Sequence, residues 1–239
     1  MEGFLALGFL IGMQHALEAD HLAAVGTLAA GGTASKRRLA LSGAVWGLGH
    51  TLTLFAICAA AILLGLSLTE RLAAALEFGV GVMLVLLGLD VIRRLRARRV
   101  HFHVHAHEGG RRHFHAHSHA GAAAPHGEDP RDHRHPEGFP LRALLIGLVH
   151  GAAGSAGLLA LAVAATREAW VAAGYVLVFG LGSILGMAAL SLAAAWPLGA
   201  AQRHARWLHS GLSLGAAALA IGLGLDVMAE TAGPAWGGV

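Results

Sequence analysis

Four residues with metal-binding side chains lie in one strongly apolar stretch near the start of the chain. The stretch reads GFLIGMQHALEADHLAAVGTLAA and contains His15, Glu18, Asp20 and His21. Ionisable side chains at bilayer depth cost about 2.5–3.5 kcal/mol each on insertion scales, so they persist mainly where they line a pathway or hold an ion. Imidazole and carboxylate groups without thiolate suit Ni²⁺, Co²⁺ or Zn²⁺. The stretch therefore predicts a transition-metal site.

The spacing of these residues constrains the helix that carries them. Successive residues of a regular helix are about 100° apart, so His15, Glu18 and His21 share one face while Asp20 points away from it. Two alternatives remain open. Either Asp20 orients a ligand histidine without binding the ion, or the helix is unwound or bulged at 15–21, as in transporters with broken helices. We favour the local break.

Two further histidines lie in apolar segments elsewhere. His50 occurs in GLGHTLTLF and His150 in GLVHGAAGSAG. Taken alone, His50 is typical of a hydrogen bond between helices, but together with the 15–21 cluster it is expected to be a ligand. The predicted metal set is thus His15, Glu18, Asp20, His21, His50 and His150. The single cysteine, Cys58, excludes a thiolate-rich site.

The remaining ionisable residues near the apolar segments are assigned structural roles. Asp90 and Asp226 are expected to cap helices or form salt bridges at the interface, because both lie near helix ends in a repeated GLDV. Glu77 is expected to be solvated, and His204 and His209 to be interfacial.

The composition requires a membrane to surround these segments. Of 239 residues, 56% are hydrophobic and only 13% are charged, and the mean hydropathy is +0.62. A soluble globular domain carries about 25% charged residues. Stretches long enough to cross a bilayer occur at 3–29, 39–66, 72–92, 140–165, 168–196 and 206–228. We therefore predict an all-α, polytopic membrane protein with six transmembrane helices.

Basic residues predict the orientation. All of the 17 Lys and Arg residues except Arg71 and Arg167 lie in or beside the connections after the first, third and fifth spans. Because basic connections stay in the cytoplasm, we expect both termini outside the cytoplasmic membrane. No basic patch with interleaved aromatics is present, so nucleic acid is not an expected partner.

The two halves of the chain resemble each other. LIGMQH (10–15) matches LIGLVH (145–150), VWGLGH (45–50) matches VFGLGS (178–183), and GLDVI (88–92) matches GLDVM (224–228), at offsets of 135, 133 and 136. Chance matching of Leu, Gly and Ala is the alternative. Because a three-helix unit is odd in number, its copy must be inverted in the membrane, with a site at mid-depth between the halves. The expected units are 1–99 and 139–239, joined by a cytoplasmic loop at 100–138.

That loop is rich in histidine. Residues 101–135 hold 11 of the 17 histidines, in runs such as HFHVHAH and HFHAHSH. Such a tract has no core to bury, so it is expected to be disordered without metal. Its expected role is low-specificity capture of divalent transition metals.

The two histidine motifs also support a family resemblance. HALEADH, followed one helix later by GLGHTLTLF, resembles the paired signatures of the nickel/cobalt transporter (NiCoT) family. The resemblance implies metal recognition by His15, Asp20, His21 and His50, with Glu18 matching an acidic residue often found in the first motif. The later aspartate/threonine motifs are missing, and GLVHGAAGSAG looks more like the UreH-type branch associated with urease and nickel supply.

The function that we expect is uptake of Ni²⁺ or Co²⁺ by alternating access, with the ion as cargo and no prosthetic group. The expected partners are the lipid bilayer, the metal ion and cytoplasmic nickel metallochaperones. GxxxxGK[ST] does not occur, so ATP coupling would need another chain. The alternatives are an efflux carrier of the same fold, a metal sensor or storage protein, and an intramembrane zinc hydrolase in which Ser155 and Ser183 join the histidines.

Overall fold

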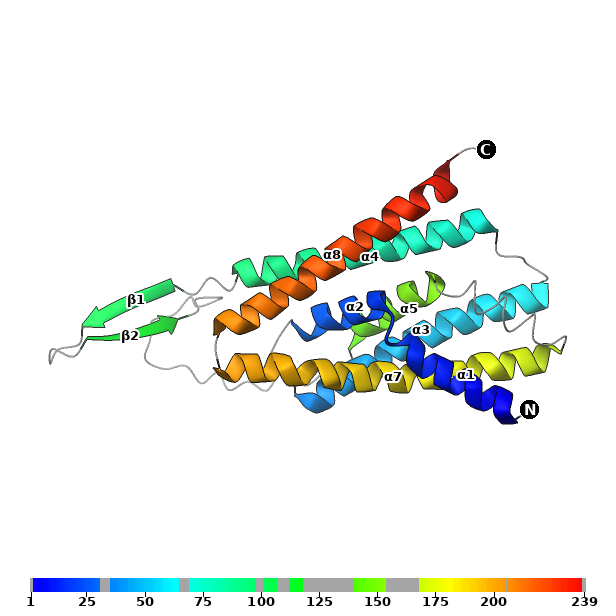
Figure 1. Ribbon diagram of the computed structural model, residues 1–239, viewed down its shortest axis with the longest axis horizontal. Helices are drawn as coiled ribbons and strands as arrows, with labels where there is room; N and C mark the ends of the chain where they lie inside the picture. Colours follow the sequence, from blue (N-terminus) through cyan, green and yellow to red (C-terminus); the bar gives the residue numbers. More distant parts are fainter. Residues whose placement is uncertain are drawn as a thin grey trace.

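The computed structural model describes residues 2–30, 35–64, 69–97, 101–106, 112–117, 140–153, 168–204 and 206–237. The helices are α1 (Glu2–His15), α2 (Ala19–Ala29), α3 (Lys36–Leu64), α4 (Glu70–Ala97), α5 (Leu141–Ala153), α7 (Ala169–His204) and α8 (Arg206–Trp236). Two strands, β1 (His101–Ala106) and β2 (Arg112–His117), lie between α4 and α5 in the chain. The helices form one elongated bundle, and the strands extend beyond one end of it (Figure 1).

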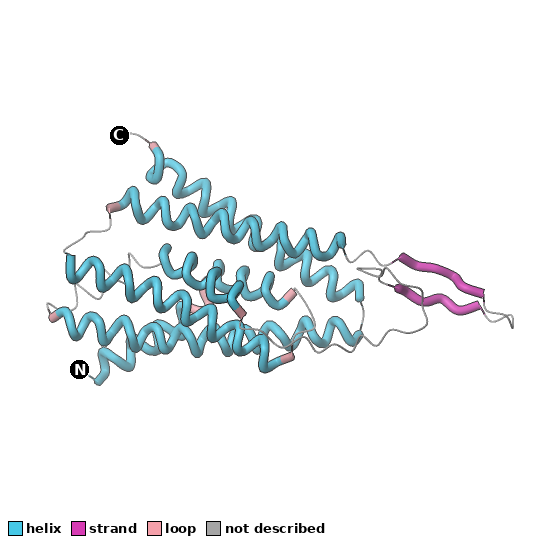
Figure 2. The backbone as a smooth tube through the Cα atoms, turned by 180° about the vertical axis from the view of Figure 1, so that it is seen from behind, coloured by secondary structure: helices cyan, strands magenta, loops and turns pink. Residues whose placement is uncertain are grey.

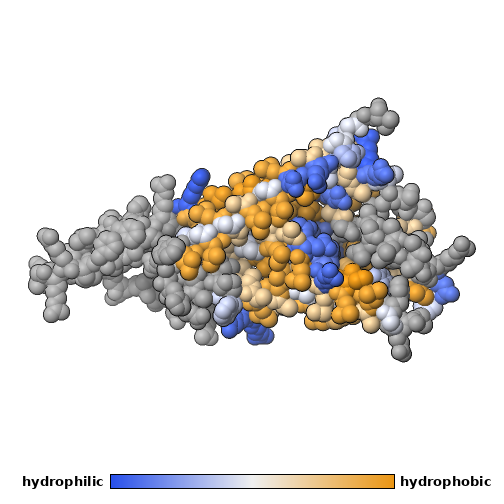
Figure 3. Space-filling view, in the orientation of Figure 1, coloured by the Kyte–Doolittle hydropathy of each residue, from blue (hydrophilic) through white to orange (hydrophobic). Residues whose placement is uncertain are grey.

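The long helices are apolar enough to cross a bilayer. Within the described residues, candidate spans run over Lys36–Ala61, Glu70–Ala97, Trp170–Ala194 and Leu208–Trp236. Hydrophobic residues cover much of the visible face of the bundle (Figure 3). Many leucines are exposed, among them Leu86 at 60% and Leu181 at 57%. Because such a surface would be costly in water, the chain is a helical membrane protein, as its composition predicts.

The other two predicted spans are not single long helices in the described structure. The first, 3–29, is divided into α1 and α2. The fourth, 140–165, is helical over Leu141–Ala153, and its later residues lie outside the described part of the chain. Figures 1 and 2 show the short helices α2 and α5 between the α4/α8 pair and the α3/α7 pair, which agrees with their contacts. The two short helices thus lie between the two pairs of long helices.

The break between α1 and α2 confirms the interruption predicted at 15–21. The amide of Leu17 donates to the carbonyl of Gln14 (2.9 Å) and that of Glu18 to His15 (3.1 Å), which are tight turns that end α1. Glu18 then takes an extended conformation (φ −64°, ψ 153°), and the amide of Leu22 bonds to its carbonyl to begin α2. This break changes the direction of the chain between His15 and His21.

Glycines let the helices of the two halves approach closely. A Cβ at Gly12 in α1 would collide with the carbonyl of Phe179 in α7, and a Cβ at Gly147 in α5 would collide with the carbonyl of Trp46 in α3. These contacts are counterparts under the sequence repeat, which matches 12 with 147 and 46 with 179. The same correspondence relates the Gly49–Leu144 contact to the Gly182–Phe9 contact. Small residues commonly form such interfaces in membranes.

The strands differ from the disorder expected for 100–138. β1 and β2 pair antiparallel, and the register sets His101 opposite His117, His103 opposite His115 and His105 opposite His113. Histidines alternate with other residues in both segments, and a period of two is the pattern of a strand. The rest of the predicted loop lies outside the described residues. The all-α prediction therefore holds for the bundle and not for this hairpin.

Candidate metal centre

Four histidines from four helices meet inside the bundle. His15 ends α1, His21 lies in the first turn of α2, His50 lies midway along α3, and His150 lies near the end of α5. Their exposed fractions are 8%, 1%, 0% and 1%. The ring centroids of His21 and His150 are 4.1 Å apart, those of His15 and His21 4.5 Å, and those of His15 and His50 5.1 Å. The structure thus places these predicted residues in one buried cluster.

Asp20 holds two of these rings. Its Oδ1 accepts hydrogen bonds from the backbone amide (2.8 Å) and the Nδ1 (2.9 Å) of His21, and its Oδ2 accepts one from Nε2 of His150 (2.8 Å). An ionised carboxylate only accepts, so those two ring nitrogens carry the protons. The lone pairs of the neutral rings then lie on Nε2 of His21 and Nδ1 of His150.

Glu18 acts on His15 in the same way. Nδ1 of His15 donates to Oε1 of Glu18 at 2.7 Å, so the lone pair of His15 lies on Nε2. This Nε2 lies 3.2 Å from Nε2 of His50. The Glu18 side chain is 56% exposed. Its position is that of a residue that orients His15 from the outside of the cluster.

Three ring nitrogens of the cluster have no hydrogen-bond partner. Nε2 of His21, Nδ1 of His50 and Nδ1 of His150 are buried and make no hydrogen bond within the described structure. A buried polar atom without a partner costs about 1–3 kcal/mol. A cluster that leaves several ring nitrogens free at one place is therefore costly unless something binds them.

The ligand atoms fall into two overlapping groups. One atom each from His15, His21 and His50 lie within 4.8 Å of one another, and so do one atom each from Asp20, His21 and His150. His21 belongs to both groups. Three imidazoles with a neighbouring carboxylate form a donor set that fits a divalent transition metal. Glu18 lies outside both groups, so a ligand role for it has no geometric support among the described residues.

Two aromatic residues that the sequence analysis did not single out border the cluster. The ring of Trp46 lies 5.4 Å from that of His21 and 5.7 Å from that of His150, and the ring of Phe179 lies 5.4 Å from that of His15. Trp46 and Phe179 occupy matching positions in VWGLGH and VFGLGS. The repeat was therefore the signal that could have identified them as paired walls of the site.

An acidic cavity reaches the cluster from one side. It has a volume of about 210 Å³, and Asp20, Glu77 and Glu230 line it together with Val80, Ala153, Val227 and Thr231. Glu77 is half-buried at this cavity, and its expected solvation stays a prediction. Glu230 belongs to α8 and has no motif around it. Only the packing of α4 and α8 on α2 brings these carboxylates to Asp20.

Other residues with predicted roles lie away from the cluster. Asp90 forms ion pairs with Arg94 (2.8 Å) and Arg142 (2.6 Å), which confirms its expected structural role. His209 is only 8% exposed, so it is buried against neighbouring helices near the start of α8, and its interfacial depth stays a prediction. The hydroxyl of Ser183 donates to the carbonyl of Gly12 at 3.2 Å. Ser155 and the side chain of His204 lie outside the described structure.

The chain has a clear relative among characterised proteins. It is 34% identical over 192 residues to the urease accessory protein UreH of Bacillus sp. (strain TB-90), and the alignment covers 77% of this chain and 72% of that protein. No family model matches the chain, and no solved structure matches it. At this identity and coverage the relationship extends over most of both proteins, and the chain therefore belongs to the UreH family.

Proposed function

We propose that this protein transports Ni²⁺, and Co²⁺ as a second cargo, across the cytoplasmic membrane into the cell. The observation that carries the proposal is the group of buried, unpartnered imidazole nitrogens at His21, His50 and His150. Nitrogen and carboxylate ligands suit these ions. Ligands in the interior of a membrane bundle fit a cargo that crosses it better than they fit a storage or sensing site.

In this proposal the histidines bind the ion and Asp20 orients them. His15, His21 and His50 replace water around the ion, and Asp20 fixes the rings of His21 and His150 so that their lone pairs face it. Protons compete with the metal for the same nitrogens, because only a deprotonated imidazole nitrogen can bind. Protonation of the histidines would therefore help to release the ion.

The proposed transport cycle uses the two halves of the chain as inverted repeats. Support comes from the paired contacts of Gly12 with Phe179 and of Gly147 with Trp46, which exchange under the sequence repeat. Rocking of one repeat against the other would open the cluster to either side in turn. The interrupted pair α1/α2 and the helix α5 would carry the ligands between the two open states.

The proposed direction is inward. Basic residues assign the hairpin connection to the cytoplasm, so the acidic cavity beside Asp20 would open toward the outside, where its carboxylates attract divalent cations. The histidine-rich connection would then buffer the ion on arrival and pass it to cytoplasmic nickel metallochaperones. The name of the relative, a urease accessory protein, fits a supply of nickel to urease.

A binding titration tests the site. Purified wild-type protein should bind Ni²⁺ in isothermal titration calorimetry, and His21→Gln should bind at least about 10-fold more weakly because one imidazole is lost. His209→Gln also replaces a buried histidine, but in α8, and should bind as the wild type does. Equal Ni²⁺ affinity of His21→Gln and the wild type would show that the cluster is not the binding site.

Efflux by the same site is the second candidate, and the histidine-rich hairpin favours it in so far as that hairpin could collect metal inside the cell. Uptake and efflux differ in the side from which metal reaches the cluster. An intramembrane zinc hydrolase has no such support, because the hydroxyl of Ser183 is bonded to the Gly12 carbonyl instead of facing the histidines.

A further inference from the structure

A second cavity lies at the end of the bundle from which the hairpin connection leaves, away from the acidic cavity. Its volume is about 340 Å³. Residues of five helices line it, among them Thr27 of α2, Arg38 and Ser42 of α3, Arg94 of α4, Arg142 of α5 and Ser191 of α7. This volume lies at the lower end of the range of small-molecule sites, about 300–1,000 Å³.

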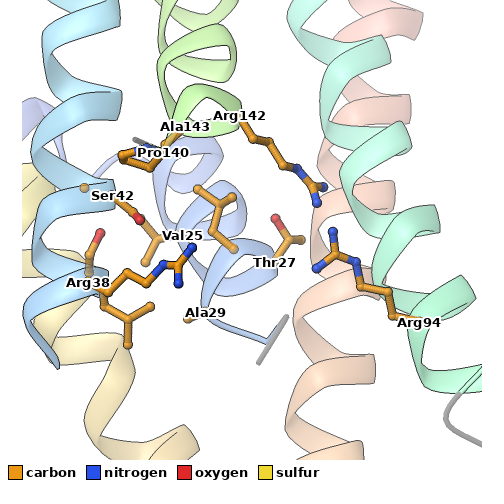
Figure 4. A pocket seen from close by; sticks show the side chains of 13 residues that line it. Val25, Thr27, Ala29, Arg38, Ser42, Arg94, Pro140, Arg142 and Ala143 are labelled. Carbon is orange, nitrogen blue, oxygen red and sulfur yellow. The ribbon is translucent and has the colours of Figure 1, made fainter. Parts of the chain in front are cut away.

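Three arginines give this cavity its charge. Figure 4 shows the guanidinium groups of Arg38, Arg94 and Arg142 around it, each from a different helix. Asp90 pairs with Arg94 and Arg142 and fixes their positions, but no carboxylate lines the cavity among the described residues. No ion pair of the Arg38 guanidinium is found in the described part of the chain. Three guanidinium groups against one carboxylate leave an excess of positive charge.

The backbone and the hydroxyl groups complete an anion site. The first turn of α5 lines the cavity, and the start of a helix carries about half a positive charge. Pro140 has no N–H and the amide of Ala143 donates to the carbonyl of Pro140 at 2.9 Å, so this turn contributes its charge more than free amides. The last turn of α2 contributes about half a negative charge, which the arginines outweigh. Ser42 and Ser191 line the cavity beside the arginines and carry hydroxyl groups that could donate to an anion, whereas the hydroxyl of Thr27 already donates to the carbonyl of Ala24 at 2.7 Å.

The orientation of the protein in the membrane does not by itself require arginines around a cavity. A cytoplasmic connection needs only exposed Lys and Arg, as Arg37 provides next to Arg38. Three arginines from separate helices around one cavity, with serine hydroxyl groups beside them, go beyond that requirement. Planar guanidinium groups bind phosphate with paired hydrogen bonds.

We propose that this cavity binds a phosphate-bearing anion, either the headgroup of an anionic phospholipid or a free phosphate compound. The lipid source has structural support beside the cavity, since Leu141 and Leu145 on the outer face of α5 are 57% and 54% exposed and could pack against acyl chains. Basic pockets between transmembrane helices on the cytoplasmic side commonly hold such headgroups. The proposal concerns binding alone and does not depend on nickel transport.

The test measures binding of phosphatidylglycerol, phosphatidylcholine and inorganic phosphate to the purified full-length protein in neutral detergent, by native mass spectrometry and thermal shift. Phosphatidylglycerol should bind in preference to phosphatidylcholine. Arg38→Gln should weaken that binding about fivefold, the loss expected for one arginine beside an anionic headgroup. Arg37→Gln removes the same charge one residue earlier and should bind within about twofold of the wild type.

The outcomes separate the sources of the anion. If inorganic phosphate stabilises the wild type but not Arg38→Gln, and displaces the lipid, the cavity binds the phosphate group itself. If phosphate has no effect while the lipid effect depends on Arg38, the ligand is the lipid. Equal weakening by Arg37→Gln and Arg38→Gln, or no effect of either, would overturn the proposal. Unchanged Ni²⁺ binding by Arg38→Gln would show that this variant is folded.

Discussion

At the residue scale, the carboxylates decide which ring nitrogen carries the proton in three of the four histidines, His15, His21 and His150. Asp20 accepts hydrogen bonds from the rings of His21 and His150, and Glu18 accepts one from the ring of His15. Each bond leaves the opposite ring nitrogen with its lone pair. The two carboxylates differ in one respect, because Asp20 uses both oxygens on two rings whereas Glu18 uses one oxygen on one ring.

This difference predicts unequal effects of removing the charge. In Asp20→Asn the amide nitrogen must face His21 or His150, so one ring has to accept a bond and turn its proton toward the metal. Ni²⁺ affinity should fall about 10–100-fold. In Glu18→Gln the amide oxygen can still accept from His15, and we expect a change of less than about threefold.

The measurement is Ni²⁺ titration of both purified variants, with thermal melting to confirm that each is folded. A folded Asp20→Asn protein with wild-type affinity would show that the carboxylate does not orient the ligands. An equally large loss in Glu18→Gln would show that net charge, and not the orientation of the rings, determines affinity.

At the element scale, the break between α1 and α2 and the close contacts of the glycines position the cluster. The break directs both His15 and Asp20 inward, which one straight helix cannot do. Gly147 of α5 packs on the backbone of Trp46 and the amide nitrogen of His50, and Gly151 packs on the backbone of His50 itself, so both glycines hold α5 close to His50.

Substitution of a glycine by alanine should destabilise the protein only where the added methyl group would collide with the backbone of a neighbouring helix. Gly12→Ala would place a methyl group against the carbonyl of Phe179, and Gly147→Ala one against the carbonyl of Trp46. Each should destabilise the protein by about 1–3 kcal/mol, as overpacking generally does. Gly211→Ala is the control, because nothing lies within 4 Å of its added methyl.

Thermal unfolding in detergent compares the three variants. We expect lower melting temperatures for Gly12→Ala and Gly147→Ala by similar amounts, since their contacts are counterparts in the repeat, and no decrease for Gly211→Ala. A melting temperature of Gly12→Ala equal to that of the wild type would contradict the close packing of α1 on α7.

The hairpin connection should help to capture Ni²⁺ and should not form part of the pathway through the membrane. Its histidines lie in a part of the chain separate from the buried cluster, so deletion of 101–135 should lower uptake at scarce Ni²⁺ and leave uptake at saturating Ni²⁺ largely unchanged. Concentration-dependent uptake in cells that express each form measures this. Complete loss of uptake by a deletion that still inserts into the membrane would make the connection part of the pathway.

The sequence predicts the residues of the cluster but not the residues around it. The break at 15–21 followed from the angle of Asp20 on a helix, and the four histidines stood out because they are costly in apolar segments. Trp46 and Phe179 carry no comparable cost in an apolar segment, because aromatic residues are common in apolar helices. Only their matching positions in the repeat mark them. Glu77 and Glu230 belong to helices far apart in the sequence, and only the packing places them beside Asp20. The β-hairpin was not predicted, because the expectation of disorder rested on composition and did not consider that the histidines alternate with a period of two residues.

At the scale of the whole molecule, the cluster lies between two cavities of opposite charge. Carboxylates line the cavity beside Asp20, and arginines line the cavity between the end of α2 and the start of α5. The matched glycine contacts relate the two halves of the chain. Under the proposed orientation, a divalent cation would meet negative charge outside, imidazoles at mid-depth, and a positively charged cavity on the cytoplasmic side.

Flux of Ni²⁺ into proteoliposomes tests the central claim most directly. Vesicles with wild-type protein should take up radioactive Ni²⁺ with saturation. Vesicles with His50→Gln should lose the saturable component, because an ion stripped of water needs that imidazole at the centre of the bundle. His209→Gln should transport as the wild type does. Saturable uptake at the wild-type rate and affinity by a folded His50→Gln protein, or no uptake by the wild type, would contradict the account.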